Sequence, residues 1–161
     1  MRTIDIANEI INQSIEYSIQ TNDKSYYTDF YSINKLIYYA QAKELKKYNG
    51  TIIDEPIIAD ITGPFIKGTL PIFGKYTHNK ITEKQEVELP VPSLIREIIR
   101  ETIEEYGMLS AQEIGILSKN EPAWIETYAH SNNPEITSEM IKKSEGQREE
   151  IPKSLILLKN K

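Results

Sequence analysis

The sequence predicts a mainly α fold: a single compact helical domain with a short irregular or β-hairpin-like insert between the central helices. Over most of the chain, apolar residues recur with the spacing of an amphipathic helix, whereas proline and glycine crowd into residues 56–71. The chain has 161 residues and no internal repeat, which fits one domain with its own core. We expect this domain to span residues 1–150, followed by a C-terminal tail over residues 151–161.

The first helix is predicted over residues 3–20. Thr3 is a suitable N-cap, and Asp5 places a negative charge in the first turn, where the helix dipole favours it. One face of this helix is apolar, and the polar stretch TNDKS that follows predicts a loop. The apolar face comprises Ala7, Ile10, Ile11 and Ile15.

Two stripes of side chains follow the second helix, which SINKLIYYAQAKELKKYNG predicts over residues 32–50, with Asn49 and Gly50 at its end. One stripe is apolar and the other is polar and aromatic. The second stripe fits either a buried network, in which the amides bind backbone groups near Gly63 and Pro64, or a surface that reaches a partner. The apolar stripe is Ile33, Leu36, Ile37 and Ala40, and the second is Asn34, Tyr38, Gln41 and Leu45, with Tyr39 beside it.

Residues 51–76 are the least helical part of the chain. Prolines and glycines interrupt them, and β-branched pairs flank the segment from Asp54 to Pro56, which favours short strands or a buried irregular loop. The next stretch, THNKITEKQEVELPVP, is polar and predicts an exposed, hairpin-like segment.

Four further helices complete the predicted domain or its end. SLIREIIRETIEEYG predicts an amphipathic helix that Ser93 caps and Gly107 ends, and SAQE, residues 110–113, matches a capping box that starts another. Pro122 suits the first turn of the next helix, and the last helix starts after Thr137. The apolar face of the first of these helices is Leu94, Ile95, Ile98, Ile99, Thr102, Ile103 and Tyr106.

Two apolar features near the C-terminus have alternative explanations. Trp124 is either a buried anchor, which we favour, or an exposed binding residue. The run SLILL, residues 154–158, would promote aggregation if it were free in water, so we expect the domain or a partner to cover it.

The composition argues against several classes of protein. The absence of cysteine excludes disulfides, thiolate zinc sites and cysteine nucleophiles. The net charge of −5 makes binding to nucleic acid unaided, or to an anionic membrane, unfavourable. The sequence contains no apolar run long enough to cross a membrane, and polar residues interrupt the N-terminal MRTIDIANEIINQ, so we expect a cytoplasmic protein without a signal peptide.

Patterns that suggest chemistry favour structural roles instead. GPFIKGT lacks the lysine that follows the second glycine of a phosphate loop, and the two histidines, His78 and His130, are too few for a histidine metal site. Residues 107–130 resemble a helix-turn-helix, but the second helix, PAWIETYAH, lacks the side chains that read bases. We therefore expect no enzymatic activity, catalytic residue, cofactor or metal. The acidic residues Glu97, Glu101, Glu104 and Glu105 are assigned to a solvated helix face.

Four sequence motifs, in this order along the chain, resemble those of a known family: INKLIYYAQAKEL, IIDEPIIADITGP, YGMLSAQEIGILSKNEPAW and EITSEMI. With them the chain resembles the Panacea domain, a family of phage-associated and antitoxin proteins, from Ile4 to Lys143. The sequence departs from the family pattern at Thr62 and Phe65, which flank the Gly-Pro pair, and at Ala123, which splits the Pro-Trp pair. The motif residues are Asn34, Lys35, Tyr38, Tyr39, Gln41, Asp54, Glu55, Pro56, Gly63, Pro64, Pro122 and Trp124.

The resemblance implies a helical antitoxin that neutralises a cognate toxin by direct protein binding, with the motif residues as candidate partner-binding residues. It also implies an alternative, in which the protein is an adaptor that delivers a bound toxin to a protease, or a phage-encoded modulator of a host protein. A helix-turn-helix regulator or a small enzyme fits less well. Members of the family serve unrelated toxins, so the toxin class does not carry over.

Overall fold

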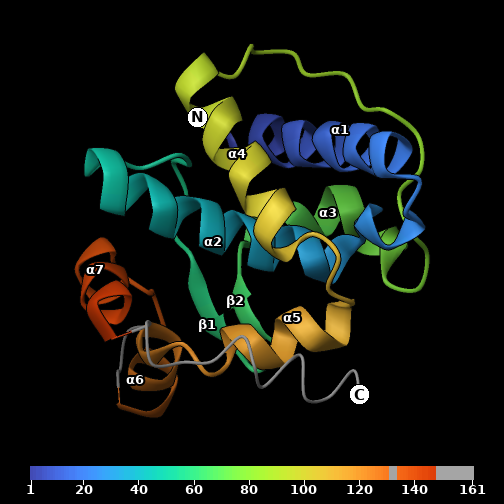
Figure 1. The fold of residues 1–161 in the computed structure, drawn as a ribbon. Helices are drawn as coiled ribbons and strands as arrows, with labels where there is room; N and C mark the ends of the chain where they lie inside the picture. Colours follow the sequence, from blue (N-terminus) through green and yellow to red (C-terminus); the bar gives the residue numbers. More distant parts are fainter. Residues whose placement is uncertain (131–133, 148–161) are drawn as a thin grey trace.

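The computed structural model describes residues 1–130 and 134–147, and this part of the chain is mainly α, as predicted. The described residues contain seven α-helices, three short 3₁₀-helices and one two-stranded antiparallel sheet, and the sheet is the insert expected between the central helices (Figure 1). The helices are α1 (Thr3–Thr21), α2 (Phe30–Tyr48), α3 (Leu70–Phe73), α4 (Ser93–Tyr106), α5 (Ala111–Ser118), α6 (Pro122–His130) and α7 (Ser138–Gln147); the strands are β1 (Ile58–Asp60) and β2 (Gly63–Phe65).

Helix α2 lies at the centre of the fold, where α1, α4, α5, α7 and β2 all contact it (Figure 1). Both stripes predicted on this helix are buried, because neighbours cover it on several sides. The helix begins two residues earlier than predicted, since the Asp29 carboxylate accepts a hydrogen bond from the Ser32 N–H and forms the N-cap. It ends as predicted, with Asn49 in the left-handed conformation at φ 57°.

Two of the predicted N-caps are wrong. Thr3 is the first residue of α1, whose N-cap is Arg2, and Ser93 is the first residue of α4, whose N-cap is Pro92. Neither N-cap makes a side-chain hydrogen bond, because arginine and proline offer no acceptor oxygen. The capping box at α5 is confirmed: the Ser110 hydroxyl accepts from the Glu113 N–H, and the Glu113 carboxylate accepts from the Ser110 N–H.

The apolar face of α4 is shorter than predicted. Five of its seven residues are buried, but Leu94 is exposed and Ile95 is only half-buried. Figure 1 shows the first turn of α4 at the edge of the fold, so this turn has few neighbours to cover it. The five buried residues are Ile98, Ile99, Thr102, Ile103 and Tyr106.

The sheet is a tight hairpin in which Asp60 pairs with Gly63. The Asp60 carboxylate accepts hydrogen bonds from the N–H and hydroxyl of Thr62 at 3.0 and 2.7 Å, which stabilises the turn. On the other edge of β1, the Ala59 N–H donates to the Pro134 carbonyl at 2.8 Å, so the chain before α7 continues the sheet. The sequence did not predict the short helix α3, which follows soon after β2.

Residues 77–92 do not form the predicted hairpin. They run as an irregular segment along α1, whose polar side chains bind their backbone. The Asn12 side chain accepts from the Gln85 N–H and donates to its carbonyl, both at 2.7 Å, and the Asn8 amide donates to the Glu86 carbonyl at 3.1 Å. These amides supply the hydrogen bonds that a second strand would have made. The side chains of Ile81 and Val91 are buried, so the segment is also not fully exposed.

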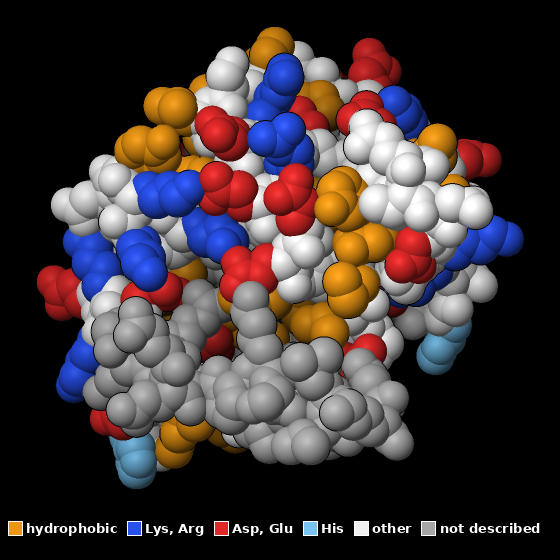
Figure 2. All heavy atoms as spheres, viewed as in Figure 1, with side chains coloured by type: hydrophobic (Ala, Val, Ile, Leu, Met, Phe, Trp, Pro, Cys, Tyr) orange, Lys and Arg blue, Asp and Glu red, His pale blue; other side chains and the backbone are white. Residues whose placement is uncertain are grey.

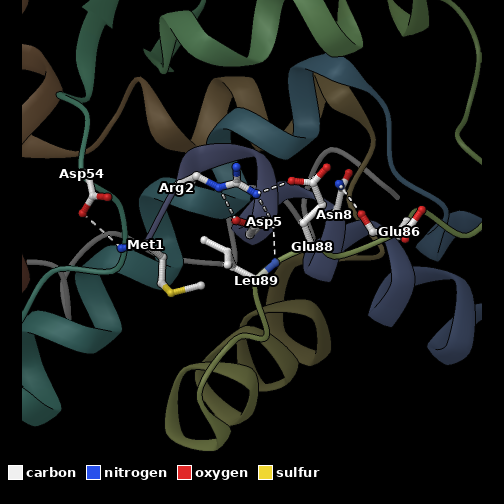
Figure 3. A network of polar contacts seen from close by, with 8 residues as sticks. All are labelled: Met1, Arg2, Asp5, Asn8, Asp54, Glu86, Glu88 and Leu89. Carbon is white, nitrogen blue, oxygen red and sulfur yellow. Dashed lines mark hydrogen bonds and ion pairs between the residues drawn. The ribbon is translucent and has the colours of Figure 1, made fainter.

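An ion-pair network at the start of α1 completes this attachment (Figure 3). The Arg2 guanidinium donates to Asp5 at 2.7 Å and to Glu88 at 3.0 Å, and the Asp5 carboxylate accepts from the Leu89 N–H at 3.3 Å. The hydrogen bonds from Arg2 hold the pKa of the Asp5 carboxyl below its usual value. Asp5 therefore joins α1 to residues 77–92, and its negative charge also interacts favourably with the positive end of the α1 dipole.

The acidic face of α4 is only partly a solvated face. Glu101 and Glu105 form ion pairs with Lys47 and Lys43 of α2, whereas Glu97 and Glu104 are exposed. Figure 2 shows acidic and basic side chains intermingled over the face where α2 and α4 lie. The pairs join the two helices across the surface, and this face presents no large area of a single charge.

Within residues 1–130 and 134–147, none of the helices is both long and apolar enough to span a bilayer. The tail over residues 151–161, including SLILL, lies outside the described residues.

Candidate functional site

Asn34 is the centre of a buried polar network that joins α2 to the insert. Its side chain is 0% exposed, and its amide donates to the Phe30 carbonyl at 2.9 Å. Its oxygen accepts from the Ile66 N–H at 2.8 Å and from the Thr69 hydroxyl at 3.1 Å. Ile66 lies just after β2, so the expected contact between Asn34 and the backbone near Gly63 and Pro64 is present.

Gln41 makes the same kind of contact about two turns further along α2, but with a different segment. Its oxygen accepts from the Ile52 N–H at 2.8 Å, and its amide donates to the Gly50 carbonyl at 2.9 Å. The expectation that Gln41 binds near Gly63 is therefore wrong. The amide instead fixes the turn that leaves α2, because it satisfies both polar groups of that backbone.

Tyr38 and Tyr39 lie in the core. The Tyr39 ring stacks on Tyr106 of α4 with ring centres 4.1 Å apart, and Tyr38 meets Tyr39 edge to face at 5.3 Å. Both rings are almost completely buried between helices, so neither is part of the exposed surface.

Lys35 is a charged residue inside the fold, only 1% exposed. Its ammonium lies 3.4 Å from the Thr62 hydroxyl, and the carboxylates of Asp60 and Asp29 act on it from the hairpin and from the start of α2. Burial lowers the pKa of Lys35 to about 8, even though both carboxylates oppose this change and only Lys119 adds to it. Burial also works to raise the pKa of Asp60, but the hydrogen bonds from Thr62 and the charge of Lys35 outweigh it and hold that pKa below its usual value.

Gly63 allows the hairpin to lie close enough to α2 for the contact between Lys35 and Thr62. It has φ +114°, a conformation that other residues rarely adopt. A Cβ at this position would lie 2.7 Å from the Ser118 hydroxyl and 3.1 Å from the Lys35 Cε. The Gly-Pro motif is thus explained by the packing of β2 against α2 and α5, and Pro64 beside it is buried as well.

The motif Asp54-Glu55-Pro56 lies on the surface, at a groove. Asp54 is 78% exposed in its side chain and pairs with the ammonium of Met1 at 3.1 Å (Figure 3). The Glu55 carboxylate accepts from the Gly68 N–H at 3.0 Å, so this glycine serves a structural turn in place of a phosphate loop. The motif residues on α2 and β2 are thus buried, whereas Asp54, Glu55 and Pro56 line the groove, with Glu55 half-buried.

Trp124 joins α6 to the hairpin. Its indole N–H donates to the Asp60 carbonyl at 2.8 Å, and its ring stacks on Tyr128 with centres 4.7 Å apart. Trp124 lies between the two alternatives: it packs against the core as an anchor would, but it is only half-buried, and Tyr128 is 49% exposed. The position in the first turn follows from Pro122, which begins α6 as predicted.

We predict that Trp124→Phe lowers the free energy of unfolding by about 1 kcal/mol. The phenyl ring can still stack on Tyr128, but the hydrogen bond to the Asp60 carbonyl is lost. Urea unfolding measures the difference, and Tyr128→Phe, which keeps its ring, serves as the control. A variant as stable as the wild type would show that the indole hydrogen bond adds nothing.

Glu121 is a buried carboxyl group between α5 and α6 that was not predicted from the sequence. It is 1% exposed, and burial raises its pKa to about 7, with a smaller contribution from Glu145. Hydrogen bonds with Tyr39 and Ser144 counteract part of this change. The sequence around Glu121 did not indicate a buried carboxyl group, because glutamates are usually exposed.

The arrangement offers no set of residues for catalysis that we can recognise in residues 1–130 and 134–147. His78 and His130 are not buried, and these ranges contain no group of three or more His, Cys, Asp or Glu residues suited to a metal. Lys35 and Glu121, two of the buried ionisable residues, belong to separate clusters: Lys35 contacts Thr62, and Glu121 contacts Ser144.

The fold and its polar interior define a small helical domain whose central helix is fixed to the insert by the buried Asn34 amide and by Lys35, and to its own exit turn by Gln41. A family model described as "Antitoxin SocA-like, Panacea domain" matches residues 33–125, and the chain belongs to this family. The match covers more than half of the chain and includes most of α2, the hairpin and the first turn of α6. Comparisons with curated proteins and with solved structures gave no match.

Proposed function

We propose that this protein is an antitoxin that neutralises a cognate toxin by direct protein binding and without enzymatic activity. The observation that carries the proposal is the family match over residues 33–125, because these residues include the central helix and the hairpin it holds. The partner is thus a toxin protein, and the antitoxin acts by covering a surface of it.

We divide the candidate partner-binding residues by their burial. The buried residues hold the domain in shape, since a partner cannot reach them without unfolding it. The accessible residues are the ones we propose for toxin contact, at the Asp54 groove and at the half-buried Trp124. The buried set is Asn34, Lys35, Tyr38, Tyr39, Gln41, Gly63 and Pro64, and the accessible set is Asp54, Glu55, Pro56, Pro122 and Trp124.

Co-expression with the product of the adjacent open reading frame tests the proposal. That product is expected to stop growth when it is expressed alone, and this chain is expected to restore growth and to co-purify with it in a fixed ratio. If no adjacent product is toxic, or if growth is restored without a complex, the proposal fails. Rescue that requires a host protease would instead support the adaptor alternative.

A further inference from the structure

A groove of about 490 Å³ separates the turn after α2 from the chain that enters α7. One wall is formed by residues 51–57 and the other by residues 135–141. Four isoleucines line it, and all four are buried in the core. Its volume is in the range of ligand pockets, and its apolar floor continues the core to the surface. The floor consists of Ile53, Ile57, Ile136 and Ile141.

The rim of this groove is acidic. Asp54, Glu55 and Glu135 line it, and none of the described residues that line it is Lys, Arg or His. The N-terminus of α7 also faces the groove, but its partial positive charge is smaller than one of these carboxylates, and the Thr137 hydroxyl already accepts from the Met140 N–H. Three carboxylates against one ammonium group, that of Met1 beside Asp54, leave the described charges at the groove net negative.

The chain's own contacts show that this rim can bind a cation. The Asp54 carboxylate holds an ammonium group, that of Met1, at 3.1 Å while its side chain remains 78% exposed. A second large groove among the described residues, of about 710 Å³ between α1 and α4, is different, because Arg96 and Arg100 line it together with Glu9 and Glu16. Of these two grooves, only the first combines an isoleucine floor with a lining whose charged side chains are all carboxylates.

We propose that this groove binds a basic segment of the protein partner. A lysine or arginine side chain can lay its apolar stem along the isoleucine floor and place its charged head among the carboxylates. The proposal rests on the antitoxin function, since it names the part of a toxin that the Asp54-Glu55-Pro56 motif recognises. It also explains why this motif lies on the surface while the motifs on α2 and β2 are buried.

The test uses the full chain, labelled with ¹⁵N, and two synthetic peptides as probes. The basic peptide, acetyl-(Lys-Leu)₃-amide, is expected to shift the amide resonances of residues 51–57 and 135–141. Its affinity is expected to fall as the salt concentration rises from about 0.05 to about 0.5 M, because exposed charges are screened. The acidic peptide, acetyl-(Glu-Leu)₃-amide, is expected to cause no shift there.

The double variant Asp54→Asn with Glu55→Gln removes two charges and keeps the shape of the rim. The amide oxygen that replaces the Glu55 carboxylate can still accept the Gly68 N–H, so the turn is preserved. Affinity for the basic peptide is expected to fall about fivefold or more. The double variant Glu83→Gln with Glu97→Gln makes the same change in net charge at exposed positions elsewhere and is expected to bind normally. If the first double variant is less stable, Asp54→Asn alone repeats the test at an exposed side chain.

The outcomes separate this inference from the proposed function. It is overturned if the basic peptide causes no shifts, if the shifts lie elsewhere, or if the Asp54 and Glu55 variants bind like the wild type. If a toxic neighbour also binds these variants as tightly as the wild type, the groove is excluded while the antitoxin function stands. Peptide binding in the groove without any toxic neighbour would support the site and reject the function.

Discussion

Replacing Asn34 with alanine is expected to lower the free energy of unfolding by about 3–4 kcal/mol. The change leaves the buried Ile66 N–H without its acceptor and removes the bond from the Asn34 amide to the Phe30 carbonyl. It also leaves a small cavity beside the core, since Asn34 is completely buried. Urea or thermal unfolding, followed by helical circular dichroism, measures the loss.

Asn120→Ala is the matched control for this prediction. Its side-chain amide donates to the carbonyl of Ile116, four residues earlier, as Asn34 does to Phe30, but Asn120 is exposed. Water can replace that bond, so Asn120→Ala should cost less than about 1 kcal/mol. Equal losses for the two variants would mean that the bond to Ile66 contributes nothing.

The sequence predicted Asn34 as a buried amide because helical spacing placed it beside an apolar stripe. The same reasoning placed Gln41 in the interior but assigned its partner wrongly. Spacing along one helix defines which face a side chain occupies, whereas its partner depends on how a distant segment folds back. A polar residue on the core-facing side of a helix can therefore be recognised from sequence, but its hydrogen-bond partner cannot.

Residues 77–92 show a second limit. Their polar composition suggested an exposed hairpin, yet Asn8 and Asn12 of α1 bind their backbone. Those asparagines lie four residues apart on α1, and the sequence analysis assigned them no role. Side chains that bind a distant backbone leave no periodic signal, so the prediction followed the local pattern. The same limit applies to Trp124, whose partner is the carbonyl of Asp60 in a turn.

The capping predictions divide in a similar way. The box at Ser110 was correct because both partners lie within one turn of the same helix. The caps at Thr3 and Ser93 were each wrong by one residue, because Arg2 and Pro92 occupy the N-cap positions although neither side chain can accept a hydrogen bond. Local sequence predicts a cap well only when the helix itself supplies the whole motif.

Replacing Lys35 with methionine is expected to stabilise the protein at pH 7 and to change how stability depends on pH. Burial lowers the pKa of Lys35 from 10.5 to about 8. Between these two values the unfolded chain keeps a proton that the folded chain has released, so the wild type gains stability as the pH rises. Below about pH 8 the folded protein carries the full penalty of a buried charge, on the order of 3 kcal/mol.

Methionine fills a similar volume without a charge, and the loss of the ammonium does not leave Asp60 unpaired. The Asp60 carboxylate keeps both hydrogen bonds from Thr62, and Asp29 keeps its ion pair with Lys80. Lys35→Met is thus expected to be about 2–3 kcal/mol more stable than the wild type at pH 7, with the difference shrinking towards pH 10.5. Lys67→Met, at an exposed position in the same insert, should leave the pH dependence unchanged. Urea unfolding of all three proteins between about pH 7 and 10 measures this, and parallel curves for the wild type and Lys35→Met would show that the buried lysine titrates normally.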